Sequence, residues 1–179
     1  QRCTFVLGFL AAAALASAAP FDWPQWRGPS RDDLSKETGL LKSWPEGGPK
    51  RVWMFENGGN AYSGPAIVAG RLYTMRTRDN AEILLALDAN TGKELWFTPL
   101  GSVLENGWGG GPRSTPTVTG GQVFAVSGKG NVVCASAADG KIVWQKKLTE
   151  LGGKVPSWGY TESLLVDGDR VVCTPGGSQ

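Results

Sequence analysis

One phrase of the sequence occurs twice and constrains the fold more than any other feature. The eleven residues Ala86–Trp96 read ALDANTGKELW, and Cys134–Trp144 read CASAADGKIVW. Their glycines, Gly92 and Gly140, stand 48 residues apart, as do the tryptophans that end the two copies. Self-similarity at such a period indicates a repeat protein, in which each unit buries its apolar face only against its neighbours.

A second repeated phrase precedes each copy of the first. Pro65–Tyr73 matches Pro116–Phe124, and Ser163–Val171 repeats it more loosely. Short apolar or alternating runs separated by turn residues predict four β-strands in each repeat. We expect strands near Pro65–Val68, Arg71–Thr77, Glu82–Leu87, Lys93–Thr98, Thr115–Thr119, Gln122–Ser127, Asn131–Ala135, Lys141–Lys146, Ser163–Val166 and Arg170–Thr174.

Four short antiparallel strands per repeat are typical of a β-propeller blade. Gly120-Gly121 and Asp167-Gly168 predict two-residue hairpin turns, in which both central residues have positive φ. A further strand is expected over 51–55, where Trp53 takes the place of an outer strand with no inner strands before it. That place suits a ring closed by joining the first outer strand to the last blade. A single turn of helix is expected near Leu148–Leu151.

Composition excludes several classes of function. The formal net charge is only +2 and there is no run of basic residues, which argues against an electrostatic nucleic-acid surface. The chain has no histidine, so it offers no Ser-His-Asp triad, no two-histidine zinc helix and no covalent haem attachment. It also has no Cys-x-x-Cys pair for a thiolate zinc or dithiol redox site.

The chain divides into three parts. Residues 1–18 are predicted to be a signal peptide, because a short apolar stretch over 5–16 precedes the small residues Ala16-Ser17-Ala18 and is too short to span a membrane. Residues 19–50 are an irregular lead-in rich in proline and tryptophan. Residues 51–179 are expected to be the N-terminal part of a longer propeller, about two and a half blades. We therefore expect an exported protein, periplasmic or secreted, with no transmembrane segment after signal removal.

The first phrase resembles the PQQ-like (pyrroloquinoline quinone) repeat, A-x-D-x-x-T-G-K-x-x-W. The segment Trp23–Arg31 resembles the start of exported PQQ-like propeller proteins of planctomycete-type bacteria. In that family the turn and the tryptophan dock neighbouring blades, commonly in an eight-bladed ring. The second copy departs from the pattern, with Ser136 in the Asp position and Asp139 in the Thr position. The resemblance assigns blade docking to Asp88, Thr91, Gly92, Trp96, Gly140 and Trp144.

The resemblance leaves two function classes open. The founding members are quinoprotein alcohol dehydrogenases, which hold PQQ and a calcium ion in the central funnel, whereas BamB-like members are docking scaffolds. The dehydrogenases commonly carry a vicinal cysteine pair over the cofactor, and this sequence has none. No catalytic residue or metal ligand is placed by any matching motif. We therefore predict a binding or assembly scaffold without a cofactor, and keep a periplasmic PQQ-dependent alcohol or sugar dehydrogenase as the alternative.

Two loops supply the candidate binding residues. The glycine-rich loop Gly107–Arg113 lacks the Gly-Lys-Ser/Thr of a phosphate-binding loop and leads straight into the second inner strand. It is therefore expected at the rim of the central channel, together with the segment that precedes the third inner strand. Loops held on a rigid scaffold commonly carry binding residues. The candidates for contact with a protein partner or a small ligand are Trp108, Arg113, Ser114, Trp158, Tyr160 and Glu162.

Overall fold

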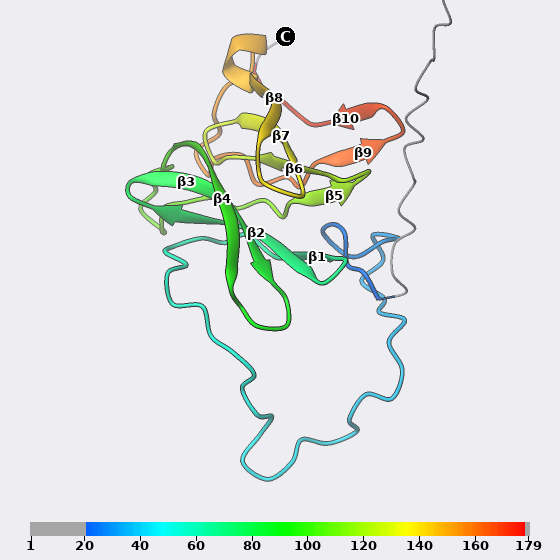
Figure 1. Cartoon of the computed structure of the whole chain (residues 1–179). Coiled ribbons are helices and arrows are strands. Elements are labelled where there is room, and N and C mark those ends of the chain that lie inside the picture. Colours follow the sequence, from blue (N-terminus) through cyan, green and yellow to red (C-terminus); the bar gives the residue numbers. More distant parts are fainter. Residues whose placement is uncertain (1–20, 178–179) are drawn as a thin grey trace, which may run out of the picture.

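The chain forms three antiparallel sheets that follow one another in space in chain order (Figure 1). The computed structural model describes residues 21–177, so the predicted signal peptide lies outside the described residues. The elements are β1 (Ala66–Val68), β2 (Arg71–Arg78), β3 (Ala81–Asp88), β4 (Glu94–Ser102), β5 (Thr117–Thr119), β6 (Gln122–Val126), β7 (Asn131–Ser136), β8 (Ile142–Lys147), the 3-10 helix η1 (Leu148–Leu151), β9 (Leu165–Asp167) and β10 (Arg170–Val172).

The sheet orders are β1-β2-β3-β4, β5-β6-β7-β8 and β10-β9. The first two sheets are complete four-stranded blades, and the third is the inner half of a blade. The inner strands β1, β5 and β9 contact one another in that order. The predicted all-β architecture of propeller blades is therefore confirmed, as is the helical turn after β8.

Both predicted hairpin turns form, but the second lies one residue further along the chain than predicted. Gly120-Gly121 forms the turn between β5 and β6, with φ of +57° and +74° as expected. In the third blade Asp167 pairs with Arg170, so the two central residues are Gly168-Asp169. Of these two, only Gly168 has a positive φ, +59°. The prediction of a positive φ at Asp167 is wrong, because β9 continues through Asp167 and moves the turn one residue along.

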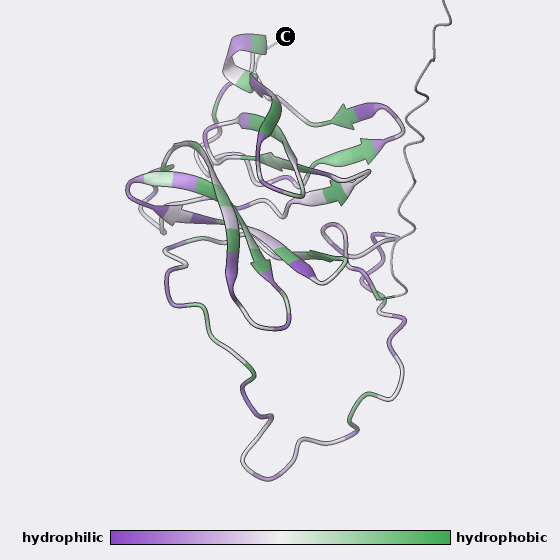
Figure 2. Ribbon diagram, viewed as in Figure 1, coloured by the Kyte–Doolittle hydropathy of each residue, from purple (hydrophilic) through white to green (hydrophobic). Residues whose placement is uncertain are grey.

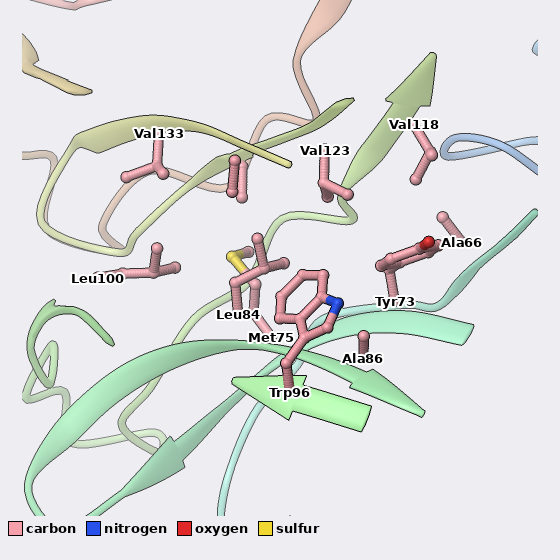
Figure 3. Close-up of a cluster of buried hydrophobic side chains, with 12 residues drawn as sticks. Ala66, Tyr73, Met75, Leu84, Ala86, Trp96, Leu100, Val118, Val123 and Val133 are labelled. Atoms are coloured by element: carbon pink, nitrogen blue, oxygen red, sulfur yellow. The ribbon is translucent and has the colours of Figure 1, made fainter. Parts of the chain in front are cut away.

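The main core lies between the facing sides of blades 1 and 2 (Figure 3). Blade 1 contributes Tyr73, Met75 and Leu84, and blade 2 contributes Val123 and Val133, all at most 2% exposed. Figure 2 shows hydrophobic residues recurring along the strands of all three sheets. Because blades 1 and 2 bury apolar faces against each other, packing between blades provides much of the burial that stabilises them.

Segment 51–55 does not form the strand that the sequence predicts there. Trp53 and Phe55 pack against blade 1, on the side of β3 away from the main core, while Val52 and Met54 are exposed. This alternation is that of a strand, yet no described strand pairs with the segment. A strand joins a ladder only where a neighbour supplies matching donors and acceptors. The predicted strand is therefore absent, although its side chains alternate as a strand's would.

The lead-in segment packs along the inner strands of the blades and lies beside β1 in Figure 1. Trp23 and Ile67 of β1 exchange two backbone hydrogen bonds, each with an N···O distance of 2.8 Å. The amide of Val118 in β5 donates to the carbonyl of Pro24 at 2.8 Å. The lead-in thus satisfies backbone groups on the edges of β1 and β5 that face away from β2 and β6.

A side chain extends this contact to the third blade. Arg31 donates from Nη2 to the carbonyl of Leu164, just before β9, at 2.9 Å, and from Nε to Oε1 of Gln25 at 3.1 Å. We call residues 22–33 the clasp, because they hydrogen-bond to all three blades. Residues 34–50 then run almost entirely exposed. Within residues 21–177, no helix has the length and hydrophobicity to cross a membrane.

Candidate functional site

The repeated phrase forms the contact between consecutive blades. The indole of Trp96 at the outer edge of blade 1 donates to the carbonyl of Ala137 in blade 2 at 3.2 Å. Its ring lies over Gly140, where a Cβ atom would be only 2.5 Å from the Trp96 Cε3 atom. The hydroxyl of Thr98 donates to the Gly140 carbonyl at 2.6 Å. A glycine is required at this position because the ring occupies the space of a side chain.

The same contact occurs one blade earlier. The indole of Trp53 donates to the carbonyl of Ala89 at 2.9 Å, and a Cβ on Gly92 would be 2.5 Å from the Trp53 ring. Trp53 therefore stands to blade 1 as Trp96 stands to blade 2. Trp144, in the equivalent place of blade 2, is half-buried and packs 6.1 Å from Phe124, ring centroid to ring centroid.

Asp88 holds the shape of the first docking turn. Its Oδ1 atom accepts from the Thr91 hydroxyl at 2.8 Å, the Thr91 amide at 2.8 Å and the Asn90 amide at 3.1 Å. Hydrogen bonds from Thr91 lower the pKa of the Asp88 carboxyl below its ordinary value. In the second turn Asp139 pairs with Lys141 at 3.0 Å instead. Both turns are closed by the glycine amide, which donates to the Asp88 carbonyl at 2.8 Å in the first turn and to the Ser136 carbonyl at 2.9 Å in the second.

The two rim loops meet, and they bring exposed aromatic side chains together. The rings of Trp108 and Trp158 lie 6.2 Å apart, with 75% and 52% of their surfaces exposed. Tyr62, from the connection into blade 1, is 60% exposed, and its hydroxyl donates to the Trp108 carbonyl at 2.6 Å. Together with Arg113 and Thr161 these residues line a hollow of about 530 Å³. We call these five residues the aromatic rim surface.

Arg113 fixes the geometry of this surface. Its guanidinium donates to three backbone carbonyls: Trp158 at 2.7 Å, Gly109 at 2.7 Å and Gly111 at 3.1 Å. The guanidinium also lies 4.9 Å from the centre of the Tyr62 ring, a cation–π distance. Arg113 thus ties together the loops that precede all three blades and holds the aromatic rings in place.

The other three rim candidates lie differently. Ser114 is buried and donates to the Val126 carbonyl at 2.9 Å. Tyr160 is buried, and its hydroxyl donates to the Pro175 carbonyl at 2.6 Å. Glu162 is half-buried and accepts from the Thr174 amide at 2.6 Å. The structure therefore gathers Trp108, Arg113 and Trp158 at the surface and places Ser114 and Tyr160 inside.

Tyr62 is a member of the rim surface that the sequence reasoning missed. The repeat itself carries a signal for it: Tyr62-Ser-Gly-Pro65 aligns with Arg113-Ser-Thr-Pro116, so Tyr62 holds the position of Arg113 in the preceding repeat. Residues that share a position in successive repeats converge around a common axis, which is why the two side chains meet.

Glu82 is a second residue that the sequence reasoning missed. It is fully buried in β3, yet its carboxylate accepts from the amides of Leu104 at 2.9 Å and Gly128 at 2.7 Å. Burial raises the pKa of Glu82, and the two amides partly offset that effect. Because Gly128 belongs to blade 2, this carboxylate joins blade 1 to its neighbour. An acidic residue inside the apolar run 81–87 was the available signal.

A second hollow tests whether PQQ and calcium fit. It has a volume of about 690 Å³, and its lining includes Trp26 and Arg31 of the clasp, Arg113, Glu162 and Cys173. Both guanidinium groups already donate to backbone carbonyls. In the described part of the chain, no three His, Cys, Asp or Glu side chains are grouped closely enough to hold a metal ion. Residues 21–177 thus hold no carboxylate cluster to which a calcium ion could be assigned, and the quinoprotein alternative stays a prediction.

Known proteins resemble this chain in sequence. The family profile described as Outer membrane protein assembly factor BamB matches residues 79–179. The outer membrane protein assembly factor BamB of Escherichia coli (strain K12) is 29% identical over 154 residues, covering 79% of this chain and 35% of that protein. BamB of Salmonella typhimurium (strain LT2) is 32% identical over 128 residues, covering 65% and 31%. The chain thus spans about a third of the length of these curated relatives.

Solved structures resemble the fold. Quinohemoprotein alcohol dehydrogenase from Comamonas testosteroni superposes with a TM-score of 0.63 at 20% sequence identity, covering 93% of this chain and 24% of that chain. A europium-containing methanol dehydrogenase superposes with a TM-score of 0.57 at 17% identity, covering 86% and 27%. At such identities the likeness establishes a shared fold and carries no statement about catalysis.

Proposed function

We propose that this chain, which belongs to the PQQ-like repeat family of the outer membrane protein assembly factor BamB, is part of an exported scaffold that binds a protein partner through its aromatic rim surface. The observation that carries the proposal is the pair of exposed tryptophans, Trp108 and Trp158, held beside Tyr62 and Arg113. Tryptophan, tyrosine and arginine are the residues most enriched among those that dominate the energy of protein interfaces.

Preorganisation supports this function. The hydrogen bonds of Arg113 and the hydroxyl bond of Tyr62 fix the loops that carry the exposed rings. A partner therefore does not bear the entropy cost of ordering these loops, which is one of the main costs of association. The aromatic side chains add large contact areas with few rotatable bonds.

Solved structures of this fold include dehydrogenases, so two assays are used to separate the two functions. We would place a photocrosslinking amino acid at Trp108 in the protein expressed in its own organism, with Leu95 on the outer strand β4 as an exposed control position. Leu95 is also an exposed apolar residue, but it lies away from the rim surface. We expect one defined protein adduct from position 108 and none from position 95.

A parallel assay tests the alternative directly. The purified protein is incubated with PQQ and calcium, and electron transfer from short alcohols or aldose sugars to a dye is measured. The scaffold function predicts no cofactor-dependent dye reduction. Dye reduction with no crosslink at position 108 would overturn the proposal and favour the dehydrogenase. Equal crosslinking from both positions would mean that the rim surface has no special role.

A further inference from the structure

We propose that Glu82, buried in β3, is the positioning residue that sets the two exposed tryptophans of the aromatic rim surface against each other. Glu82 is fully buried, so it acts through the loops that carry Trp108 and Trp158. The inference rests on the scaffold function proposed above and names the residue that controls the shape of its binding surface. It follows from two branches of hydrogen bonds that begin at the two oxygens of this one carboxyl group.

The first branch leads to the loop of Trp108. Oε1 of Glu82 accepts from the Leu104 amide at 2.9 Å, and the Leu104 carbonyl accepts from the Gly111 amide at 3.0 Å. Leu104 and Gly111 stand on either side of Trp108 in the chain, so the bond between them closes the loop at its base. Because Glu82 holds Leu104, it fixes this base relative to blade 1.

The second branch leads to the loop of Trp158. Oε2 of Glu82 accepts from the Gly128 amide at 2.7 Å, and the Gly128 carbonyl accepts from the Tyr160 amide at 2.9 Å. Tyr160 stands two residues after Trp158. Each oxygen of the carboxyl group is therefore connected, through one intervening residue, to the loop of one of the two tryptophans.

The side chain of Leu104 joins the two branches. It is buried, and a Cβ atom on Gly128 would be 2.8 Å from the Leu104 Cβ atom. A Cβ atom on Gly159, the residue after Trp158, would overlap the Leu104 Cδ2 atom. Because closely packed groups cannot move independently, a shift of Leu104 would displace both tryptophan loops.

Other hydrogen bonds between the two loops lie at the surface. The Asn106 side-chain amide donates to the Ser157 carbonyl at 2.9 Å, and Arg113 Nε donates to the Trp158 carbonyl at 2.7 Å. Both bonds are exposed, so water can replace either partner when the loops separate. The two amides bonded to Glu82 are buried and would lose their acceptor without replacement. We therefore expect the carboxyl group to have the larger effect on the loops.

Glutamine at position 82 breaks one branch and keeps nearly the same volume. A carboxyl group presents an oxygen to each of the two amides, whereas a glutamine side chain presents one oxygen and one NH₂ group, which is a donor. Thr98→Val is the matched control for Glu82→Gln. The buried Thr98 hydroxyl also bonds blade 1 to blade 2, at 2.6 Å, but it does so at the docking turn and outside the rim loops.

The test measures the purified protein at neutral pH. Amide hydrogen exchange, followed by NMR, reports the opening of each loop. The second readout is the circular dichroism couplet of Trp108 and Trp158, whose rings lie 6.2 Å apart at an interplanar angle of 32°. It is obtained by subtracting the spectrum of the same protein with Trp108→Phe, and it depends on the relative orientation of the two rings. The amide NMR spectrum checks that each variant is folded.

We expect the Gly111 and Tyr160 amides of the unmodified protein to exchange more slowly than the Gly109 amide, which bonds only within its own turn. In Glu82→Gln, exchange of the Gly111 or the Tyr160 amide should quicken about tenfold, the factor for a buried amide left without its acceptor. The couplet should shrink in the same variant. Thr98→Val should change neither readout.

Several results would overturn the inference. Equal exchange of the three amides in the unmodified protein would do so even if Glu82→Gln does not fold. Unchanged exchange and an unchanged couplet in Glu82→Gln would do so too, as would equal changes in Thr98→Val.

The photocrosslinker at position 108 connects this role to the scaffold function. The yield of the protein adduct should fall in Glu82→Gln and stay the same in Thr98→Val. An unchanged yield despite loosened loops would overturn the inference and leave the scaffold function standing. If the unmodified protein gives no adduct, the scaffold function falls, while the exchange rates and the couplet still decide whether Glu82 positions the rings.

Discussion

Replacing Gly140 by alanine should separate blade docking from ordinary turn geometry. Gly140 has a φ of +73°, and an added Cβ would lie 2.5 Å from Cε3 of Trp96 and 2.7 Å from the Thr98 hydroxyl. Gly70 has the same φ of +73° but nothing within 4 Å of its Cβ position. Gly70→Ala is therefore a matched control that has the same backbone strain without the contact.

The two costs differ in kind and can be added. A left-handed backbone costs an alanine about 1 kcal/mol, which both variants lose. Displacing a packed ring costs about 2 kcal/mol more, the range seen when an interior is overfilled. We expect the free energy of unfolding to fall by about 3 kcal/mol in Gly140→Ala and by about 1 kcal/mol in Gly70→Ala. Urea unfolding followed by far-ultraviolet circular dichroism measures both.

A double-mutant cycle tests the assigned cause. In a Trp96→Ala background there is no ring over position 140, so the excess cost of Gly140→Ala over Gly70→Ala should disappear. If the two glycine variants lose the same stability in the wild-type background, Trp96 does not depend on Gly140 and the docking role is refuted. An excess that persists without Trp96 would place the contact elsewhere, for instance at Thr98.

Two further predictions concern Glu82 and the clasp. The folded-state pKa of Glu82 is raised by burial, so its stabilising contribution is complete below the ordinary glutamate pKa of about 4.3 and is lost as the pH rises through the folded pKa. The unfolding free energy of the wild type should therefore fall relative to Glu82→Gln as the pH rises from about 4, and a relative rise would contradict this sign. Removing two side-chain hydrogen bonds by Arg31→Ala should speed hydrogen exchange in residues 22–33 about tenfold. The exposed Lys36→Ala should not change that exchange, and equal rates in the two variants would show that Arg31 does not hold the clasp.

The strands and turns of the blades could be predicted from the sequence because residues close together in the chain specify them. Alternation of apolar residues marks each strand, and the glycine pairs and Asp88 mark the turns between strands. The 48-residue period then requires each sheet to bury its face against the next one. The resemblance to the PQQ-like repeat assigned Gly92 and Trp96 to docking before any contact was known.

The candidate site could be located only in part. Sequence order placed Trp108, Arg113 and Trp158 on two loops near the channel, and the structure brings them together. The sequence did not reveal that Ser114 and Tyr160 are buried, because a loop has no periodicity from which burial can be predicted.

The sequence by itself determined the strands of the blades and the turns between them, since strands and turns depend on residues close together in the chain, and it showed the repeat directly. Only the tertiary structure decided that Tyr62 joins the rim surface and that the clasp reaches three blades through Trp23, Pro24 and Arg31. It also decided that the segment around Trp53 has no ladder partner within residues 21–177. These features depend on the position of one blade relative to the next. That position is fixed by packing across the whole interface, which no local pattern of residues encodes.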